Sequence, residues 1–256
     1  MKFRYLLITI FSILLLTLSC SDNSVSDSET EQEEVFTYDH EINPGESTTD
    51  FLTSDSFEEL VIEIDYMQGY APTQEALDNL QQFLEERLNK TSITILNPTE
   101  IPAVGQSEYT ANEIRDLERQ HRDEFSEEGI LTAYFIFVDS EFAQANVLGI
   151  AHFNTSMALF GETIEGASGG VGQVSREDIE TIVIRHEFGH IIGLVNNGAD
   201  MQDNHQDTEN GRHCDVDSCL MYFSVRTTDF FANVFGGNIP ELDEQCIADL
   251  QAAGGK

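Results

Sequence analysis

The segment IVIRHEFGHIIGL, residues 182–194, constrains this chain more than any other. His186 and His190 are four residues apart, so on a helix their imidazoles lie on one face and can bind one metal ion. Glu187 directly follows the first histidine, where its carboxylate can take a proton from a zinc-bound water. The alternative is a pair of core histidines, but polar groups in so apolar a helix need partners to offset their desolvation. The pattern therefore predicts a buried helix that carries a zinc site, with Glu187 as the general base.

The sequence from residue 57 onwards predicts strands and helices in alternation. The motif helix is expected to begin at Arg176, because Ser175 and Asp178 fit a capping box. The glycine-rich stretch before it, residues 161–172, fits no phosphate-binding pattern and is expected to be a flexible loop. The periodicities predict strands over 60–67, 92–96, 131–139, 147–153 and 156–160, helices over 72–90 and 111–125, and a closing helix over 239–251. The strand at 131–139 is the most hydrophobic and is expected to be central. This order indicates an α+β fold: a mixed twisted sheet with two packing helices, an active-site helix and a C-terminal helix.

The N-terminus is typical of a secretory signal. Residues 1–19 have a basic start, Lys2 and Arg4, and then an apolar run too short for a retained membrane helix. Cys20, directly after Leu-Ser, resembles the lipobox of bacterial lipoproteins, which implies that this cysteine is lipidated. Residues 20–56 are rich in acidic and hydroxyl side chains, so we expect a disordered tether before a peptidase domain at 57–256.

The charge of the chain bears on its partners. Asp and Glu number 47 against 12 Lys and Arg, a formal net charge of −35, which would repel a phosphate backbone and argues against nucleic acid as a partner. We expect a monomer that is secreted across the inner membrane and held by its lipid in a bacterial cell envelope, in the periplasm or at the cell surface.

The third zinc ligand must come from elsewhere in the chain. HEFGHIIG, residues 186–193, resembles the metzincin metallopeptidases, but Asn196 stands where their HExxHxxGxxH pattern has its third histidine. Further on, RHCDVDSCLMYFS, residues 212–224, resembles the HCx4CxM segment of archaemetzincin-type peptidases. This resemblance, which extends to bacterial metalloprotease lipoproteins, implies that His213 is the third ligand, that Met221 forms the Met-turn beneath the site, and that residues 195–212 are an insertion. His205 and Asp207, inside that insertion, are the alternative ligands.

The cysteines also follow from the resemblance. Archaemetzincins hold a second, structural zinc with four cysteines, which implies a role for Cys214, Cys219 and Cys246; Asp243 stands where the fourth thiolate would be. Outside the cytoplasm we expect a Cys214–Cys219 disulfide instead, with Cys246 free. A zinc ion bound by the three cysteines and Asp243 is the alternative.

Two weaker features complete the candidate site. Tyr222 follows Met221 and is a candidate for stabilising an oxyanion, although a packed aromatic side chain is the favoured interpretation. Several acidic side chains of the insertion could bind calcium but lack EF-hand spacing, so a solvated loop is expected: Asp200, Asp203, Asp207 and Glu209.

These features together predict a secreted zinc endopeptidase of the metzincin type that acts on a peptide or protein substrate. One alternative is a zinc-binding surface lipoprotein without turnover, for which Glu187 would be unnecessary. Another is an aminopeptidase, which would need an acidic pocket for a free amine.

Overall fold

The computed structural model describes residues 36–170, 174–233 and 239–256. The expected signal peptide, Cys20 and the tether as far as residue 35 lie outside these ranges. Within them, none of the helices is both long enough and apolar enough to cross a membrane.

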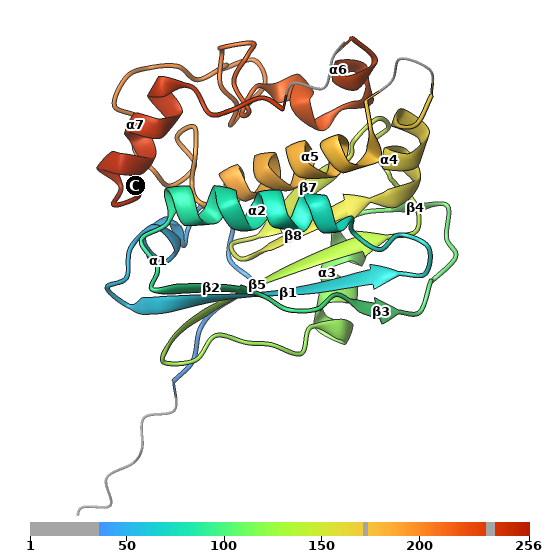
Figure 1. Cartoon of the computed structure of the whole chain (residues 1–256), viewed down its shortest axis with the longest axis horizontal. Helices are drawn as coiled ribbons and strands as arrows, with labels where there is room; N and C mark the ends of the chain where they lie inside the picture. The colour runs from blue at the N-terminus through green and yellow to red at the C-terminus, as the bar shows by residue number, and fades with distance from the viewer. Residues whose placement is uncertain (1–35, 171–173, 234–238) are drawn as a thin grey trace, which may run out of the picture. The chain divides into compact units, whose positions relative to one another are not determined.

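A mixed sheet forms the centre of the fold (Figure 1). In the described residues it has six strands, in the order β2-β1-β5-β8-β7, with β3 also paired to β1. All neighbours are parallel except β7 and β8, which are antiparallel, so the prediction of a mixed sheet with a central strand at 131–139 is confirmed. The bounds are β1 (Phe57–Met67), β2 (Ser92–Ile95), β3 (Thr99–Ile101), β5 (Gly129–Val138), β7 (Gly149–Phe153) and β8 (Ser156–Phe160); β4 (Glu108–Tyr109) and β6 (Glu141–Phe142) pair separately.

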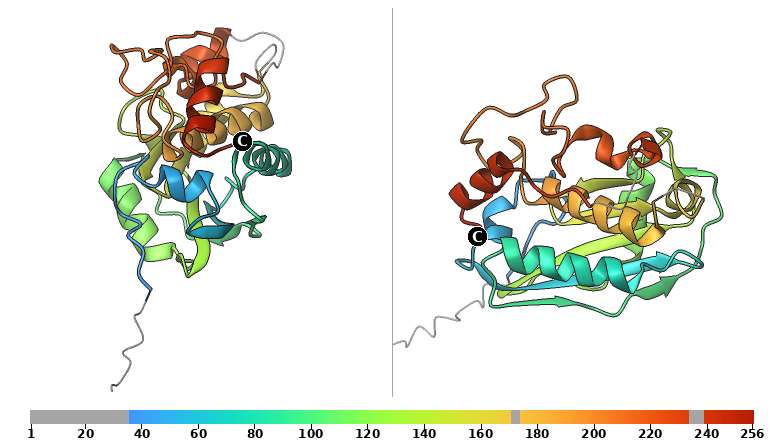
Figure 2. Two further views of the ribbon diagram at one scale, coloured as in Figure 1. Left: turned by 90° about the vertical axis from the view of Figure 1, so that its left-hand side faces the viewer. Right: turned by 45° about the horizontal axis from the view of Figure 1, so that its top comes forward.

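Both faces of the sheet are covered. Successive side chains of a strand point to opposite faces, and in β5 Phe135 and Phe137 belong to one hydrophobic cluster while Tyr134 and Ile136 belong to the other. The helices α2 (Gln74–Arg87) and α5 (Arg176–Ile191) lie over the first face, and α3 (Ala111–His121) lies over the second (Figure 2). Burial on both faces explains why the sequence of β5 is a continuous apolar run.

α2 is slightly shorter than the expected helix at 72–90, and three other helices differ more from expectation. α3 ends at His121 rather than at residue 125, because the next residue, Arg122, is extended and turns its guanidinium into the protein. The glycine-rich stretch contains a helix, α4 (Gly161–Ala167), whose Ile164 packs into the main core; this packing outweighs the low helix propensity of its glycines. α7 (Glu244–Ala252) begins after Asp243, whose side chain caps it, and not near Pro240. The remaining short helices are η1 (Phe223–Arg226) and α6 (Thr228–Asn233).

The prediction of a tether up to residue 56 is wrong for residues 36–56, which are part of the folded unit. A short helix, α1 (Thr48–Leu52), places Phe51 and Leu52 in the core with no exposed surface. Gly45 lies so close to the turn after α5 that a Cβ on it would be 1.5 Å from the carbonyl oxygen of Asn197. The few apolar side chains in an otherwise polar segment are thus the ones that anchor it.

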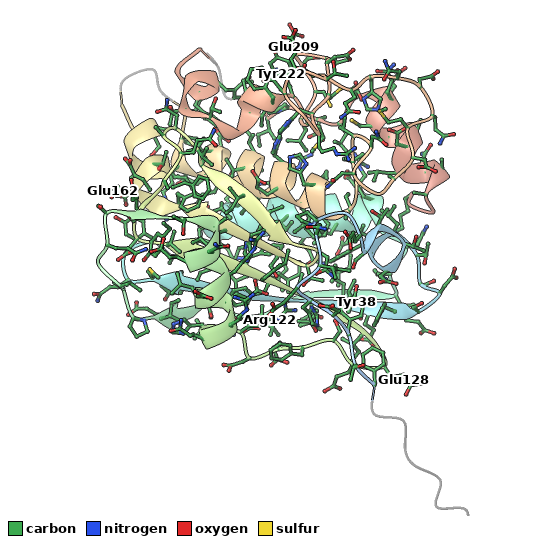
Figure 3. All side chains as sticks on the ribbon, turned by 180° about the vertical axis from the view of Figure 1, so that it is seen from behind. Tyr38, Arg122, Glu128, Glu162, Glu209 and Tyr222 are labelled. Atoms are coloured by element: carbon green, nitrogen blue, oxygen red, sulfur yellow. The ribbon has the colours of Figure 1, made fainter. Side chains whose placement is uncertain are left out.

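A buried polar network holds α3 against the edge strand β7. The Glu118 carboxylate bonds His152 Nε2 at 2.6 Å, accepts a hydrogen bond from Ser156 Oγ at 2.6 Å, and pairs with the Arg122 guanidinium at 2.8 Å. Arg122 lies against the lower part of α3 in Figure 3 and also donates to Thr132 O. Because every member is buried and bonded, the network fixes the position of β7 relative to the helix behind it.

His40 ties the N-terminal segment to this network and makes the fold sensitive to acid. Its Nε2 accepts a hydrogen bond from Ser126 N, and its Nδ1 bonds Thr155 Oγ1 at 3.0 Å. Burial, together with the charge of Arg122, lowers its pKa to about 4, while Glu118 and Asp39 oppose this shift. A proton on Nε2 would also abolish the bond from Ser126.

We predict that the chain loses about 1–2 kcal/mol of stability through His40 between pH 7 and pH 5. The unfolded histidine, with a pKa near 6.5, binds a proton in this window and the folded one does not, so acid favours unfolding. The His40→Gln variant, whose amide can still accept from Ser126, should lose correspondingly less. Urea unfolding of both proteins at the two pH values measures the difference. Equal losses in the two proteins would contradict this role for His40.

Candidate active site

The helix α5 carries the motif and is buried along most of its length. It begins at Arg176, as predicted, with the side chain of Ser175 accepting a hydrogen bond from Asp178 N. Every residue from Ile179 to Ile191 is buried. Such a helix must be apolar on all sides, or its buried polar groups must have partners. The groups around its two histidines and Glu187 therefore indicate its function.

Three histidines converge at the C-terminal half of α5. His186 and His190 come from the helix, and His213 comes from the segment after the insertion. Their ring centroids are 5.0 Å apart for 186–190, 5.3 Å for 186–213 and 4.9 Å for 190–213. One nitrogen from each ring lies within 4.8 Å of the others, as binding of one ion requires.

Backbone carbonyls orient two of these rings. His186 Nδ1 bonds Leu220 O at 2.7 Å, and His213 Nδ1 bonds Asn210 O at 2.7 Å. A carbonyl oxygen can only accept, so Nδ1 is the protonated nitrogen and Nε2 carries the lone pair. This is the arrangement by which proteins present a neutral imidazole to a metal, and the donor set therefore fits zinc.

Glu187 lies beside the three histidines at a cavity of about 310 Å³. Its Oε2 accepts a hydrogen bond from the backbone N–H of Ala151 in β7, at 2.8 Å, which fixes the carboxylate against the edge of the sheet. Three parts of the chain form the cavity wall: the N-terminal segment, β7, and the region from α5 to His213. The lining residues are Asn43, Pro44, Ile150, Ala151, Glu187, His190, Asn197, Arg212 and His213.

The turn after α5 and the segment around Met221 support the site from below. Gly193 has a φ of +87°, and a Cβ on it would be 2.0 Å from Thr48 Oγ1 of α1, so the sharp turn requires glycine. Gly189, between the two helical histidines, is equally confined, because a Cβ there would lie 2.3 Å from Met221 Sδ. Met221 thus packs directly against the helix backbone under the histidines.

Other predicted residues lie apart from this cavity. Tyr222 is half-buried, its ring packs against Phe223 at 5.2 Å, and it is not among the described residues that line the cavity (Figure 3). The acidic residues of the insertion belong to neither cluster of possible metal ligands found in the described chain. The Asp207 carboxylate instead accepts hydrogen bonds from Asn210 Nδ2 and Glu209 N within its own turn.

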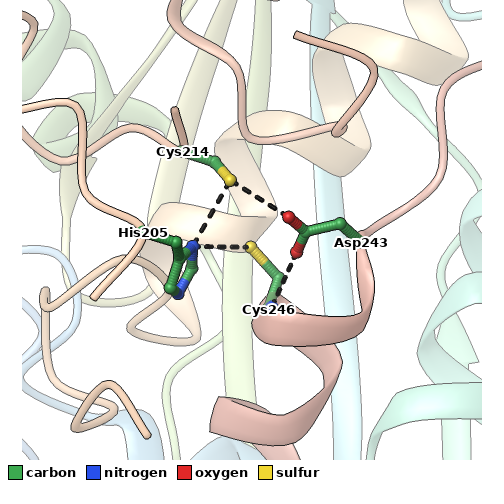
Figure 4. Close-up of side chains that lie close together, drawn as sticks. All are labelled: His205, Cys214, Asp243 and Cys246. Atoms are coloured by element: carbon green, nitrogen blue, oxygen red, sulfur yellow. Dashed lines mark hydrogen bonds between the residues drawn. The ribbon is translucent and has the colours of Figure 1, made fainter. Parts of the chain in front are cut away.

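A second cluster of possible ligands lies under the C-terminal segment (Figure 4). His205 Nδ1 lies 3.3 Å from Cys214 Sγ and 3.9 Å from Cys246 Sγ. Asp243 Oδ2 lies 3.3 Å from Cys214 Sγ, while its other oxygen caps α7 by accepting from Cys246 N. Cys219 Sγ is 3.7 Å from Cys246 Sγ. The sequence indicates His205 only as an alternative to His213 as the third ligand of the first site. The structure places it in the second cluster.

The expected Cys214–Cys219 disulfide is not formed. All three cysteines are buried free thiols. The thiols of Cys214 and Cys246 hydrogen-bond Cys219, which lowers the pKa of Cys219 to about 4, while the pKa values of the two donors are raised. The three sulfur atoms converge with His205 and Asp243. A disulfide would join only two of these sulfurs.

His205 is held in place by a buried carboxylate. Its Nε2 bonds Asp249 Oδ2 at 2.8 Å, and both side chains are fully buried. Burial lowers the pKa of His205, but the bonds to Asp249 and Cys214 outweigh it and raise the pKa overall. Asp249 also accepts from Gln202 N. The sequence offers no signal for Asp249 beyond its place on the inner side of α7.

Comparison with known proteins gives distant likenesses in structure, two of which are described below. No family model matches the sequence, and neither does any curated protein. The chain is similar to the crystal structure of archaemetzincin from Methanopyrus kandleri, with a TM-score of 0.46, 16% identity, and coverage of 78% of this chain and 96% of that one. It is also similar to metalloproteinase-II from Bacteroides fragilis, with a TM-score of 0.39, 14% identity, and coverage of 79% and 55%.

Proposed function

We propose that the chain is a zinc-dependent endopeptidase. The observation that carries this proposal is the convergence of His186, His190 and His213 next to a cavity that Glu187 and the edge strand β7 also line. Three histidines leave a further coordination position open, as catalytic zinc sites require and closed structural sites do not.

Each residue then has a definite role. His186, His190 and His213 would hold the ion, which when bound acts as a Lewis acid on a carbonyl and lowers the pKa of water. Glu187 accepts the proton of the attacking water and returns it to the leaving amine. The Ala151 N–H holds one oxygen of Glu187 and so fixes the position of the carboxylate at the cavity. Met221 supports the helix backbone below, which keeps the two helical imidazoles in register.

The cavity favours cleavage within a peptide. β7 is the last strand of the described sheet, and Ile150 and Ala151 line the cavity, so an extended peptide can lie along them. An aminopeptidase would need a carboxylate to bind the free amine, but Glu187 is the single carboxylate among the described lining residues. A binding protein without turnover would have no use for a base at this position.

The second cluster supports a second, structural zinc. His205, Cys214 and Cys246 converge with Asp243, and Cys219 lies next to them. Soft thiolates and an imidazole are ligands that zinc prefers, and Asp249 orients His205 as a supporting carboxylate does. Since His205 and the three thiols are buried and Asp243 is half-buried, such a site would be closed and would have no catalytic role.

The N-terminal sequence supports a location in the cell envelope. Its signal-like residues 1–19 and the cysteine that follows support secretion and attachment of a lipid to Cys20. Residues 21–35 would then separate the folded unit from the membrane.

We predict that Glu187→Gln lowers peptide cleavage by about a hundredfold or more, since it removes the general base. Zinc content should be unchanged because Glu187 is not a ligand. Cleavage of a mixed peptide library, read by mass spectrometry, measures the first effect, and metal analysis measures the second. Glu162→Gln, on the exposed surface of α4, is the matched control. Wild-type protein that carries zinc and cleaves nothing would refute the peptidase proposal.

We predict two zinc ions per chain in the wild type and one in Cys246→Ser. The remaining ion should still support cleavage if the variant folds, as judged by circular dichroism. Thiol alkylation provides a second measurement, because Cys214, Cys219 and Cys246 should react only after zinc is chelated. A native protein with one zinc and three reactive thiols would rule out the second site.

We predict that Cys20→Ser moves the protein from the membrane fraction to the soluble fraction of the producing cells and abolishes its labelling by a fatty-acid precursor. The same variant should keep both zinc ions, which makes it the matched control for Cys246→Ser. Membrane association that persists without Cys20 would contradict a lipid anchor at this residue.

A further inference from the structure

Arg212 is a cation of the proposed catalytic cavity, and no carboxylate of the described residues forms an ion pair with it. It is exposed, it lines the same cavity as Glu187 and His190, and it directly precedes His213 in the chain. Its guanidinium donates to a neutral group, the backbone carbonyl of Asn196. None of the ion pairs in the described part of the chain includes it. In a chain with 12 basic and 47 acidic residues, such a cation at the reacting centre needs an explanation.

The other lining residues do not supply a partner. Asn197 directs its side-chain amide to Pro44 O and His190 O. Glu187 is occupied by the Ala151 N–H on one oxygen and, in the proposed function, by the water on the other. Pro44 and Ile150 contribute apolar surface to the wall. Among the described lining residues, the cavity therefore offers an incoming peptide one permanent positive side chain, Arg212, and a single carboxylate, Glu187.

A guanidinium has five N–H donors in a planar fork, which matches the two oxygens of a carboxylate. Arg212 uses only part of this capacity on Asn196. The overall charge of −35 does not prevent an acidic group from approaching, because at physiological salt the charges of the remote surface are screened beyond about 8 Å. The local contact then decides the preference.

We propose that Arg212 is a specificity-determining residue that binds a carboxylate of the substrate next to the scissile bond. The substrate class is peptides that carry Asp or Glu at a position flanking the cleaved bond. This inference rests on the proposed peptidase function, since it assigns the substrate of the same cavity. The C-terminal carboxylate of a peptide has the same chemistry as an acidic side chain. The peptides described below distinguish between the two.

The test compares matched peptides with the full-length protein. The first peptide has Asp beside the cleaved bond and an amidated C-terminus, and the second has Asn in place of Asp. The third peptide also has Asn, but it ends directly after this residue with a free C-terminal carboxylate. We expect the wild type to prefer Asp over Asn by about tenfold in kcat/KM, the effect of one charge-assisted hydrogen bond pair in a half-exposed site. Arg212→Gln should reduce this ratio to about one, and Arg212→Lys should keep part of it.

The control is Arg119→Gln, which changes the net charge by the same amount. Arg119 lies on α3, away from the cavity, and its guanidinium already pairs with Glu41 and Asp116. It should keep the full preference for Asp. An Asp preference that survives in Arg212→Gln, or is lost equally in Arg119→Gln, would overturn the assignment. Preference for the free carboxylate alone, lost in Arg212→Gln, would also overturn the side-chain assignment and make Arg212 a terminal-carboxylate site.

Binding provides a readout that does not depend on turnover. In the zinc-loaded Glu187→Gln background, fluorescence anisotropy should show the labelled Asp peptide binding about tenfold more tightly than the Asn peptide, and Arg212→Gln should remove the difference. Selective binding without cleavage by the wild type would refute the proposed function and leave the carboxylate site standing. Equal binding of both peptides would refute the carboxylate site whatever the activity.

Discussion

The burial of α5 on all sides is the constraint on which the rest of the structure depends. A helix whose residues 179–191 are all buried can carry His186, Glu187 and His190 only if each polar group meets a partner or a ligand. The sheet and α2 cover its apolar sides. The carbonyl of Leu220 and the amide of Ala151 satisfy His186 and Glu187. Glu187 and His190 line the cavity, so the chemistry of the helix faces that side.

The second cluster holds the segment that completes the first. His213 and Cys214 are neighbours in the chain, and so are Cys219 and Leu220, whose carbonyl orients His186. Cys214 also forms bridges to Gln206 on one side and Tyr222 on the other. A metal bound by the thiols would therefore fix two neighbouring groups. Through Cys214 it would fix the imidazole of His213, and through Cys219 it would fix the Leu220 carbonyl that orients His186. The short segment 213–220 therefore contributes both to the cysteine cluster and to the arrangement of the three histidines.

Much of this arrangement could be predicted from the sequence, and the failures have specific causes. The mixed sheet with its central strand and the start of α5 followed from periodicity and a capping pattern, which are local signals. Composition predicts a tether over 36–56, because it averages over a stretch in which a few side chains, Phe51 and Leu52 above all, are buried in the core. The disulfide was expected from compartment chemistry and from the proximity of two cysteines in sequence, whereas Cys246 and His205 approach the same sulfurs from distant positions. Asn43 and Pro44 could not be found at all, since only tertiary packing brings them to the cavity.

The contacts of residues 195–212, which the family resemblance implies to be an insertion, account for the placement of His205, Arg212 and His213 together. This segment separates His190 from His213 by more than twenty residues of chain, and a free loop of that length would leave the third ligand poorly placed. Its middle is anchored because His205 is fully buried between Asp249 and Cys214. Its ends are joined because Arg212 donates to Asn196 O. The segment thus brings His205 to the second cluster, beside Asp243, and Arg212 to the proposed catalytic cavity. A loop that is anchored in this way does more than connect His190 and His213, since the same contacts that order it place Arg212 in the cavity wall with Glu187.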